Sequence, residues 1–521
     1  MRQLLKTLPR LPYPGRAPRP SSLIRRPFHT GSVTRQQSET GTDADTGVSI
    51  RPTSAPKTVI DIKHIRQNPA LYEQNCIERN YKAQSGNPAR INQLHEQWQA
   101  KQREGRALRE RSNLLRRELA NPPSTRDEAE AEGHSVEPRE KLIEEARQLK
   151  EQLSEIEDAE ESLTQEMARL AVALPNLTSA NTPRGEEPLV LSYINNDPEQ
   201  EGSRFSESDR VWRSHVHIGS ELGLLDFAGA ASSSGWGWYY LLNEGAELEQ
   251  ALVQYALAVA THHGWSQVSP PSIVYSHIAD ACGFQPRDQN GETQIYTLAR
   301  STADAARGKP ELSLTATAEI PLAAMKADTQ LEESELPARR VAASRCYRAE
   351  AGARGADTKG LYRVHEFTKV EMFAWSAPSE AAAEEVFEEM LDIQTEILGS
   401  LGLRCRVLEM PTADLGASAT RKIDIEAFFP SRQQKNDGWG EVTSASICTD
   451  YQTRRLSTRV RFDGKMTFPW TLNGTALAVP RVVAAILENG WDENSMTVKI
   501  PEVLRPWMNG KDKISGKHRR K

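Results

Sequence analysis

The chain has 521 residues, of which 38% are hydrophobic and 26% are charged, and its net charge is −6. This length predicts two or three domains with additional tails. The negative net charge excludes a global positive field, so any nucleic acid must be bound by local basic patches. No apolar run approaches the roughly 18 residues that a membrane helix requires, and we expect no membrane contact. The five cysteines show no paired short spacing, which indicates a reducing compartment without disulfides or structural zinc.

The N-terminal segment differs in composition from the rest of the chain. Residues 1–38 contain no acidic side chain but eight Arg or Lys residues, which is typical of an organelle transit peptide. Arg26-Pro27-Phe28 is similar to a matrix-processing site. We therefore predict a transit peptide and a disordered linker over residues 1–50. A disordered basic arm that contacts nucleic acid is the alternative.

Two segments with a heptad repeat of apolar residues follow. The first contains Ile91, Leu94, Trp98, Leu108, Leu115 and Leu119, and the second contains Leu142, Ala146, Leu149, Leu153, Ile156, Leu163, Met167, Leu170 and Leu174. Gly105 and Glu160 interrupt the repeat. The segment between them contains Pro122 and Pro123 and cannot continue a helix. This pattern predicts an antiparallel coiled-coil hairpin, with arms about 50 Å long at roughly 1.5 Å per residue.

The charges on the two arms are unequal, because the first arm is rich in Arg and the second in Glu. Interhelical salt bridges would explain this charge pattern. The hairpin itself could serve as a dimerisation device or as a spacer. The third interpretation is a basic stripe that contacts a phosphate backbone.

The remainder of the chain mixes short strands and helices. We predict strands near residues 266–274, 312–317, 340–348, 361–373, 405–409, 422–429 and 441–450, and helices at 380–401 and from 479 onward. The absence of regular β-α-β alternation predicts an α+β domain with a largely antiparallel sheet. We place a connector at residues 177–230, this domain at 231–505, and a disordered basic tail at 506–521.

Four short segments in this domain carry reactive side chains. They are Thr317-Ala318-Glu319, Arg348-Ala349-Glu350 with the following 351–371, Glu441-Val442-Thr443-Ser444, and Asn473-Gly474-Thr475 ahead of Arg481. An arginine, carboxylates and an aromatic ring on neighbouring strands can hold a nucleotide and an amino acid together.

These segments, in this order behind a heptad hairpin, resemble the motifs of class II seryl-tRNA synthetases over about residues 58–500. The resemblance implies a class II catalytic fold over residues 231–505 and a tRNA-binding hairpin domain over residues 51–176. It implies that serine and ATP give seryl-adenylate, whose seryl group passes to the 3′ end of tRNA(Ser). The segment before and through 264–271 resembles the dimer-interface motif, which implies a homodimer. Together with the N-terminal segment, the resemblance implies a mitochondrial-matrix enzyme, with an additional cytosolic form left open.

The resemblance also implies roles for individual residues. Arg348, Glu441 and Arg481 would be catalytic, with the Arg348 guanidinium holding the α-phosphate and the serine carboxylate. The implied ATP site consists of Arg348, Ala349, Glu350, Val364, Phe367, Glu441, Val442, Thr443, Ser444 and Arg481. The implied serine site consists of Thr317, Ala318, Glu319, Arg348, Glu371, Asn473 and Thr475. Glu441 and Ser444 would hold Mg²⁺ bound to ATP, since hard cations prefer oxygen ligands. The implied tRNA contacts are Arg103, Arg106 and Arg109 on the hairpin and Arg354 and Lys359 in the loop of residues 353–360, which resembles the family's motif 2 loop.

Simpler explanations exist for several of these residues. Arg348 and Glu441 could form ordinary salt bridges, Phe367 could be core packing, and Thr475 could be a helix N-cap. Three features depart from the family pattern: Ile447 replaces a polar residue, Pro480 replaces a glycine, and residues 232–238 lack the usual basic side chains. A catalytically silent paralogue with a structural or RNA-binding role, or a coiled-coil scaffold, remains the alternative to an active ligase.

Overall fold

The computed structural model describes residues 55–120, 139–195, 213–284, 294–350, 360–433 and 436–516. The chain divides into two units, residues 1–44 and residues 45–521, and all described residues belong to the second. The predicted transit peptide and the loop residues Arg354 and Lys359 lie outside the described residues. No helix among the described residues is both long and apolar enough to cross a bilayer.

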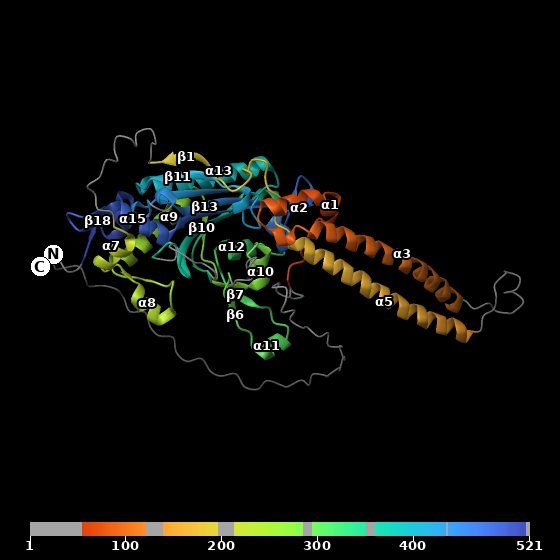
Figure 1. The fold of residues 1–521 in the computed structure, drawn as a ribbon. Helices are drawn as coiled ribbons and strands as arrows, with labels where there is room; N and C mark the ends of the chain where they lie inside the picture. Colours follow the sequence, from red (N-terminus) through yellow and green to blue (C-terminus); the bar gives the residue numbers. More distant parts are fainter. Residues whose placement is uncertain are drawn as a thin grey trace, which may run out of the picture. The chain divides into compact units, whose positions relative to one another are not determined.

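The predicted helical hairpin is present. Helices α3 (Asn87–Ala120) and α5 (Arg139–Val172) lie side by side (Figure 1), and interhelical bonds such as Arg111 to Glu145 and Asn87 to Leu170 show that they run antiparallel. Three short helices precede them: α1 (Ile62–Gln67), α2 (Pro69–Glu78) and η1 (Lys82–Gln84). A small core closes the base of the hairpin, formed by Ile65, Cys76, Ile91, Leu94, Met167, Ala171 and Leu174.

The two interruptions of the heptad repeat lie in neighbouring turns of the hairpin, and each has a structural reason. Glu160 accepts hydrogen bonds from Gln102 Nε2 (2.5 Å) and Arg109 Nη2 (3.2 Å) across the seam, which makes a polar layer. One turn away, a Cβ on Gly105 would lie 3.2 Å from Cγ2 of Ile156. The glycine therefore lets Ile156 approach α3 closely.

Within the described residues, eight strands form the main sheet in the order β1-β11-β12-β13-β16-β10-β9-β4. Every neighbouring pair is antiparallel except β4 and β9, which confirms the predicted α+β class. The bounds are β1 (Leu189–Ile194), β11 (Cys405–Glu409), β12 (Arg421–Phe428), β13 (Trp439–Thr449), β16 (Trp470–Ala478), β10 (Glu366–Ser376), β9 (Ala338–Tyr347) and β4 (Ser266–Val268).

The remaining elements surround this sheet. Smaller sheets contain β2 (Leu225–Asp226) with β3 (Tyr240–Leu241), β5 (Ile273–Tyr275) with β7 (Leu312–Leu314) and β6 (Thr297–Leu298), β8 (Gln330–Glu332) with β14 (Arg459–Phe462) and β15 (Lys465–Thr467), and β17 (Trp491–Asp492) with β18 (Thr497–Lys499) and β19 (Lys513–Ser515). The α-helices are α7 (His215–Glu221), α8 (Phe227–Ser234), α9 (Glu244–His262), α10 (Ser276–Ala281), α11 (Thr302–Ala306), α12 (Glu319–Ala324), α13 (Glu380–Ser400), α14 (Tyr451–Leu456) and α15 (Val479–Gly490). Short 3₁₀ turns are η2 (Glu333–Glu335), η4 (Thr412–Asp414), η5 (Pro430–Arg432), η6 (Asn436–Gly438) and η7 (Glu502–Met508).

Different helices cover the two faces of the sheet, and the side chains of β10 point alternately to one face and to the other. Val370 and Met372 lie in the large core with α9, α13 and α15. Phe373 and Trp375 lie in a second core with α10 and α12. Since side chains alternate along a strand, Lys369 and Glu371 lie on the same face as Phe373, away from the large core.

Three segments differ from their predicted form. The predicted strand over residues 266–274 is two strands, β4 and β5, which belong to different sheets. The predicted connector supplies β1, the edge strand of the main sheet. The predicted disordered tail is ordered over residues 506–516, because η7 extends to Met508, β19 pairs with β18, and Lys511 Nζ lies 2.6 Å from Glu247 Oε2.

All five cysteines are buried and unpaired, and all lie within the described residues. They are Cys76, Cys282, Cys346, Cys405 and Cys448. Burial raises the pKa of every one of these thiols, to about 11 for Cys76 and to about 12 for Cys405. No pair forms a disulfide.

Candidate active site

The centre of the candidate site is a buried ion pair on β10 that touches β16. Lys369 Nζ lies 2.5 Å from Glu371 Oε2, and the two side chains are 8% and 2% exposed. Thr475 Oγ1 donates to Glu371 Oε2 (3.2 Å) and accepts from Lys369 Nζ (3.3 Å). Thr475 lies within β16, and α15 begins only at Val479, so the N-cap explanation for Thr475 is wrong.

A second carboxylate, Glu319, is held at the start of α12. Its Oε1 accepts hydrogen bonds from Asn473 Nδ2 and Gln452 Nε2, each 2.6 Å long. Its backbone N–H donates to the hydroxyl of buried Thr317 (3.2 Å). Ala318, between them, is fully buried. The three residues of the segment 317–319 thus form one fixed turn, with the carboxylate aimed at β16.

The two carboxylates are close enough to interact electrostatically. Burial raises the pKa of Glu319 to about 8, and the negative charge of Glu371 adds to this rise, while Lys369 and the amides of Gln452 and Asn473 oppose it. Of the predicted serine residues, Glu319, Glu371, Asn473 and Thr475 are therefore brought together around one polar cluster. Such a cluster can bind an ammonium group and a hydroxyl at the same time.

Two arginines lie beside this cluster. Arg348 follows the end of β9, and Arg481 lies in the first turn of α15, next to Glu441 near the start of β13. Arg481 Nη1 bonds the Glu441 carboxylate (3.1 Å) and the Glu441 carbonyl (2.9 Å). Burial alone would raise the pKa of Glu441, but Arg481, Lys422 and Arg348 together lower it. Arg348 directly follows β9, and its guanidinium lies over Phe367, which is two residues before Lys369 on β10. Arg348 therefore lies at the margin of the polar cluster. Only Arg481 contacts Glu441 directly, and Lys422 is paired with Asp424 (2.8 Å). Guanidinium groups such as those of Arg481 and Arg348 suit a polyphosphate.

Aromatic and acidic groups of the predicted adenine site lie at the same margin. The Arg348 guanidinium lies 5.2 Å from the centre of the half-buried Phe367 ring, a cation–π contact. Glu350 has a positive φ of 48° and its Oε2 lies 3.6 Å from Arg363 Nε. Val364 is 5% exposed. Ala349 is fixed through its N–H, which donates to the Gln294 carbonyl (3.0 Å).

The β13 residues of the predicted ATP site are held mainly through their backbone. The Thr443 hydroxyl donates to the Thr475 carbonyl, and Gln394 Nε2 donates to the carbonyls of Ser444 and Thr475 (both 2.9 Å). Val442 is fully buried in the large core. The described residues contain no cluster of three or more His, Cys, Asp or Glu that could form an all-protein metal site.

The predicted tRNA residues of the hairpin differ in their contacts. Arg106 and Arg103 are exposed on α3, with Arg106 paired to Glu110 in the same helix. Arg109 instead bonds Glu160 of α5 (3.2 Å). The interhelical salt bridge thus explains the position of Arg109, whereas the exposed side chains of Arg103 and Arg106 can contact a phosphate backbone.

Sequence reasoning missed four residues that shape the site. Lys369, Gln452, Lys422 and its ion-pair partner Asp424 (2.8 Å) were not predicted. Lys369 could have been found, because it lies two residues from both Phe367 and Glu371 on one strand and therefore faces the same side. Gln452 could not, because its partner Glu319 is 133 residues away. Two departures from the family pattern have local reasons: Pro480 lies in the first turn of α15, where its missing N–H has no cost, and Ile447 packs in the large core.

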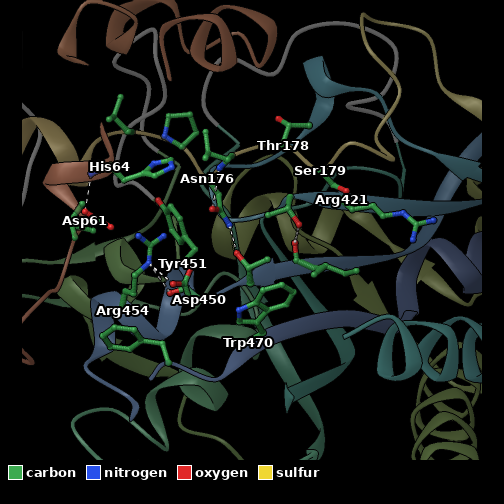
Figure 2. Close-up of a pocket in the computed structure, with 18 of the residues that line it drawn as sticks. Asp61, His64, Asn176, Thr178, Ser179, Arg421, Asp450, Tyr451, Arg454 and Trp470 are labelled. Atoms are coloured by element: carbon green, nitrogen blue, oxygen red, sulfur yellow. Dashed lines mark hydrogen bonds and ion pairs between the residues drawn. The ribbon is translucent and has the colours of Figure 1, made fainter. Parts of the chain in front are cut away.

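The structure also contains a cavity of about 800 Å³ at the base of the hairpin. Figure 2 shows it lined by Asp61 and His64 on one side and by Asp450, Arg454 and Trp470 on the other. None of the predicted catalytic or serine-binding residues lines it. Nearby, Asn176 Nδ2 donates to the Cys448 carbonyl (2.8 Å), so this cavity belongs to the joint between the hairpin base and the sheet.

Comparison with known proteins identifies related chains. Residues 59–178 match the family "Seryl-tRNA synthetase N-terminal domain", and residues 296–490 match "tRNA synthetase class II core domain (G, H, P, S and T)". The mitochondrial serine–tRNA ligase of Saccharomyces cerevisiae is 45% identical over 70% of this chain and 77% of the yeast protein. The mitochondrial serine–tRNA ligase of Schizosaccharomyces pombe is 38% identical over 88% of this chain and 89% of its own length. The crystal structure of seryl-tRNA synthetase from Pyrococcus horikoshii complexed with ATP superposes with a TM-score of 0.74 at 32% identity, covering 88% of this chain and all of that one.

Proposed function

The chain belongs to the class II seryl-tRNA synthetases and is a serine–tRNA ligase, and from this premise we propose which of its residues perform each step. The alternatives of a catalytically silent paralogue and of a coiled-coil scaffold gain no support from these relatives. The observation that carries the assignment is the single polar cluster of Glu319, Glu371 and Thr475, with Arg348 against Phe367 on the strand that bears Glu371.

The serine subsite consists of the two buried carboxylates and their partners. Glu371 and Thr475 bind the serine hydroxyl, since their side-chain oxygens lie 3.2 Å apart and both accept from Lys369 Nζ. Glu319, oriented by Asn473 and Gln452, binds the ammonium group. Alanine cannot form the hydrogen bonds that Glu371 and Thr475 make to the serine hydroxyl, and sites built for a hydroxyl reject an analogue that lacks it strongly. Threonine is refused by shape because of its additional methyl group.

The ATP subsite consists of the cations and the rings beside them. Arg348 holds the α-phosphate and the serine carboxylate, Arg481 the distal phosphates, and Phe367 with Val364 covers the adenine, whose edge Glu350 reads. The main-chain segment 442–444, fixed by Gln394, lines the nucleotide. A serine carboxylate oxygen forms a bond to the α-phosphorus as the bond to the β-phosphate breaks and pyrophosphate leaves. Positioning and charge stabilisation supply most of the rate.

Magnesium is the expected partner of ATP at this site. Glu441 fits it, because the cations keep this carboxylate ionised and its side chain is 42% exposed, and Ser444 is the second oxygen donor. When bound, Mg²⁺ would neutralise phosphate charge. The protein's own contribution is to hold Glu441 and Arg481 together.

The second step transfers the seryl group to the terminal adenosine of tRNA(Ser). Its hydroxyl forms a bond to the seryl carbonyl carbon, and AMP leaves. We assign tRNA contacts to Arg103 and Arg106 on the hairpin domain, residues 51–176, and to Arg354 and Lys359. Recognition of this kind reads shape and backbone.

We also propose a homodimer located in the mitochondrial matrix. Strand β1 at the edge of the sheet exposes Leu189, Val190, Leu191 and Tyr193 by 39% or more, and an apolar edge strand of this kind is normally covered. The basic N-terminal segment and the mitochondrial relatives support the location. Sedimentation at several protein concentrations and cell fractionation with an antibody test these two statements.

Serine-dependent exchange of pyrophosphate into ATP tests the central assignment. We expect exchange with serine, and at least a hundredfold less with threonine or alanine. Arg348→Ala should lower exchange by about a hundredfold or more, with unchanged circular dichroism. Arg339→Ala is the matched control, since Arg339 lies on β9, which ends just before Arg348, but pairs with Glu389 (2.8 Å). Near-normal exchange by Arg348→Ala would remove this residue from the catalytic role.

A further inference from the structure

An exposed aromatic segment lies beside the candidate site and is unused by the assignments above. Trp236 and Trp238 lie in the turn between α8 and β3, and Tyr240 is the first residue of β3. Trp236 is 57% exposed and Tyr240 is 46% exposed. Residues 227–243 contain no charged side chain, and this is where the family's basic residues are missing. The segment therefore offers ring faces rather than charges.

Both tryptophans are fixed on His365, which precedes β10. The Trp236 ring meets His365 edge-on (centroids 6.0 Å apart, planes at 81°), and the Trp238 ring is tilted against it (5.9 Å, 31°). Gly237 between them has a φ of 83°, and a Cβ there would lie 2.4 Å from His365 Cδ2. Its carbonyl accepts the His365 N–H (3.0 Å). The glycine is thus required for the two indoles to enclose the imidazole.

His365 connects this segment to the reacting end of the site. The Arg348 N–H donates to the His365 carbonyl (2.9 Å), and His365 Nδ1 donates to the Arg348 carbonyl (3.0 Å). The exposed indole is therefore separated by one residue from the arginine assigned to the α-phosphate. A polymer whose end must reach that phosphate passes over or near this surface.

We propose that Trp236, supported by Trp238 and Tyr240, is a stacking surface for an unpaired base at the 3′ end of the tRNA. This inference rests on the proposed function. Unpaired RNA bases are bound by stacking on aromatic side chains, and a rigid indole loses little conformational freedom when it binds. A neutral aromatic surface holds a base by its face, independently of phosphate charge.

The test compares two half-reactions in the full-length protein. Trp236→Ala should lower kcat/KM for tRNA in aminoacylation by about tenfold, the usual effect of losing one stacked base. Pyrophosphate exchange without tRNA should change less than twofold. Trp236→Phe should recover most of the loss. Trp507→Ala, which removes a 45% exposed tryptophan elsewhere, should match wild type in both assays.

A shortened substrate separates stacking from a general defect. Wild type and Trp236→Ala should bind tRNA that lacks its unpaired 3′ nucleotides with equal affinity, whereas intact tRNA should favour wild type. Equal losses in exchange and aminoacylation, or unchanged use of intact tRNA, would overturn the proposal. Conversion of the variant to a smaller sedimenting species would also overturn it, since Trp236 would then contact a second copy of the chain. Failure of wild type to exchange with serine would instead refute the proposed function.

Discussion

His215 and Glu488 form a hydrogen bond of 2.8 Å between Nδ1 and Oε1, with side chains that are 1% and 0% exposed. The other imidazole nitrogen, Nε2, accepts the N–H of Leu361 (3.0 Å), so Nδ1 carries the proton. Glu488 also accepts from the Tyr362 hydroxyl (3.1 Å), and the Tyr362 carbonyl accepts from Arg481 Nε (3.1 Å). This buried pair thus positions the residues after the motif 2 loop and, through Tyr362, Arg481.

Replacing the acceptor, Glu488, should lower the stability of the folded protein by an amount that depends on pH. Burial opposes ionisation, but the donors from His215 and Ser431 lower the pKa of Glu488 below its usual value of 4.5. The unfolded chain therefore binds more protons, and this stabilisation is present above about pH 4.5 and is lost as the pH falls through the folded pKa. Glu488→Gln should cost about 2–4 kcal/mol at pH 7 and flatten the loss of stability below pH 4.5. Urea unfolding between pH 3.5 and 7 measures both, and an unchanged acid slope would contradict the role of Glu488.

Serine binding should release a proton from Glu319. With a pKa of about 8, this carboxyl is largely protonated at pH 7, and an ammonium ligand favours its ionised form. Serine affinity should therefore rise up to about tenfold per pH unit between pH 6 and 8. Calorimetry in buffers of different ionisation enthalpy detects the proton. Glu319→Gln should remove the release, and Glu385→Gln, an exposed control, should not. Buffer-independent binding heats for wild type would refute this prediction.

The same carboxyl should destabilise the serine-free protein at high pH. Because the folded pKa is raised above that of the unfolded chain, stability decreases as the pH rises from about 4.5 to about 8. Without serine, Glu319→Gln should therefore melt several degrees higher than wild type at pH 8 and more similarly at pH 5. Thermal melts at the two pH values provide the comparison.

Removing one member of the Lys369–Glu371 pair should be worse than removing both. Lys369→Met leaves Glu371 buried with only the Thr475 hydroxyl, and uncompensated buried charges cost about 3–5 kcal/mol. The double variant Lys369→Met with Glu371→Met should regain most of this stability, although neither protein should bind serine normally. Denaturant unfolding of the two variants tests the coupling. Additive losses would mean that the two groups act independently.

Several elements could be predicted from the sequence because their signal is local. The heptad repeat predicted α3 and α5, β11 was predicted with its observed bounds, and the helix from residue 479 begins where expected. The site residues on β10 and β16 followed from their motifs. What the sequence does not contain is the pairing between distant residues: His215 with Glu488, Gln452 with Glu319, and the joining of β19 to β18. Each joins segments through tertiary contacts that no local periodicity records.

The hairpin arginines should affect tRNA binding according to their present partners. Arg103→Glu combined with Arg106→Glu should weaken tRNA binding about tenfold or more and reduce the salt slope of log K by about one to two. Arg147→Glu, on the acidic helix and 70% exposed, is the control. Arg109→Ala should mainly lower hairpin stability, because it leaves Glu160 without its arginine. Filter binding from 50 to 300 mM salt distinguishes them, and equal effects of the double variant and the control would argue against a basic stripe on α3.

The burial of all five cysteines has a consequence for redox chemistry. Only thiolates react quickly with peroxides and alkylating agents, and each thiol here has a raised pKa and is shielded from solvent. The folded enzyme should therefore resist hydrogen peroxide and iodoacetamide at neutral pH. Labelling by iodoacetamide then requires the structure around a cysteine to open, and the labelling rate measures how often this local unfolding occurs.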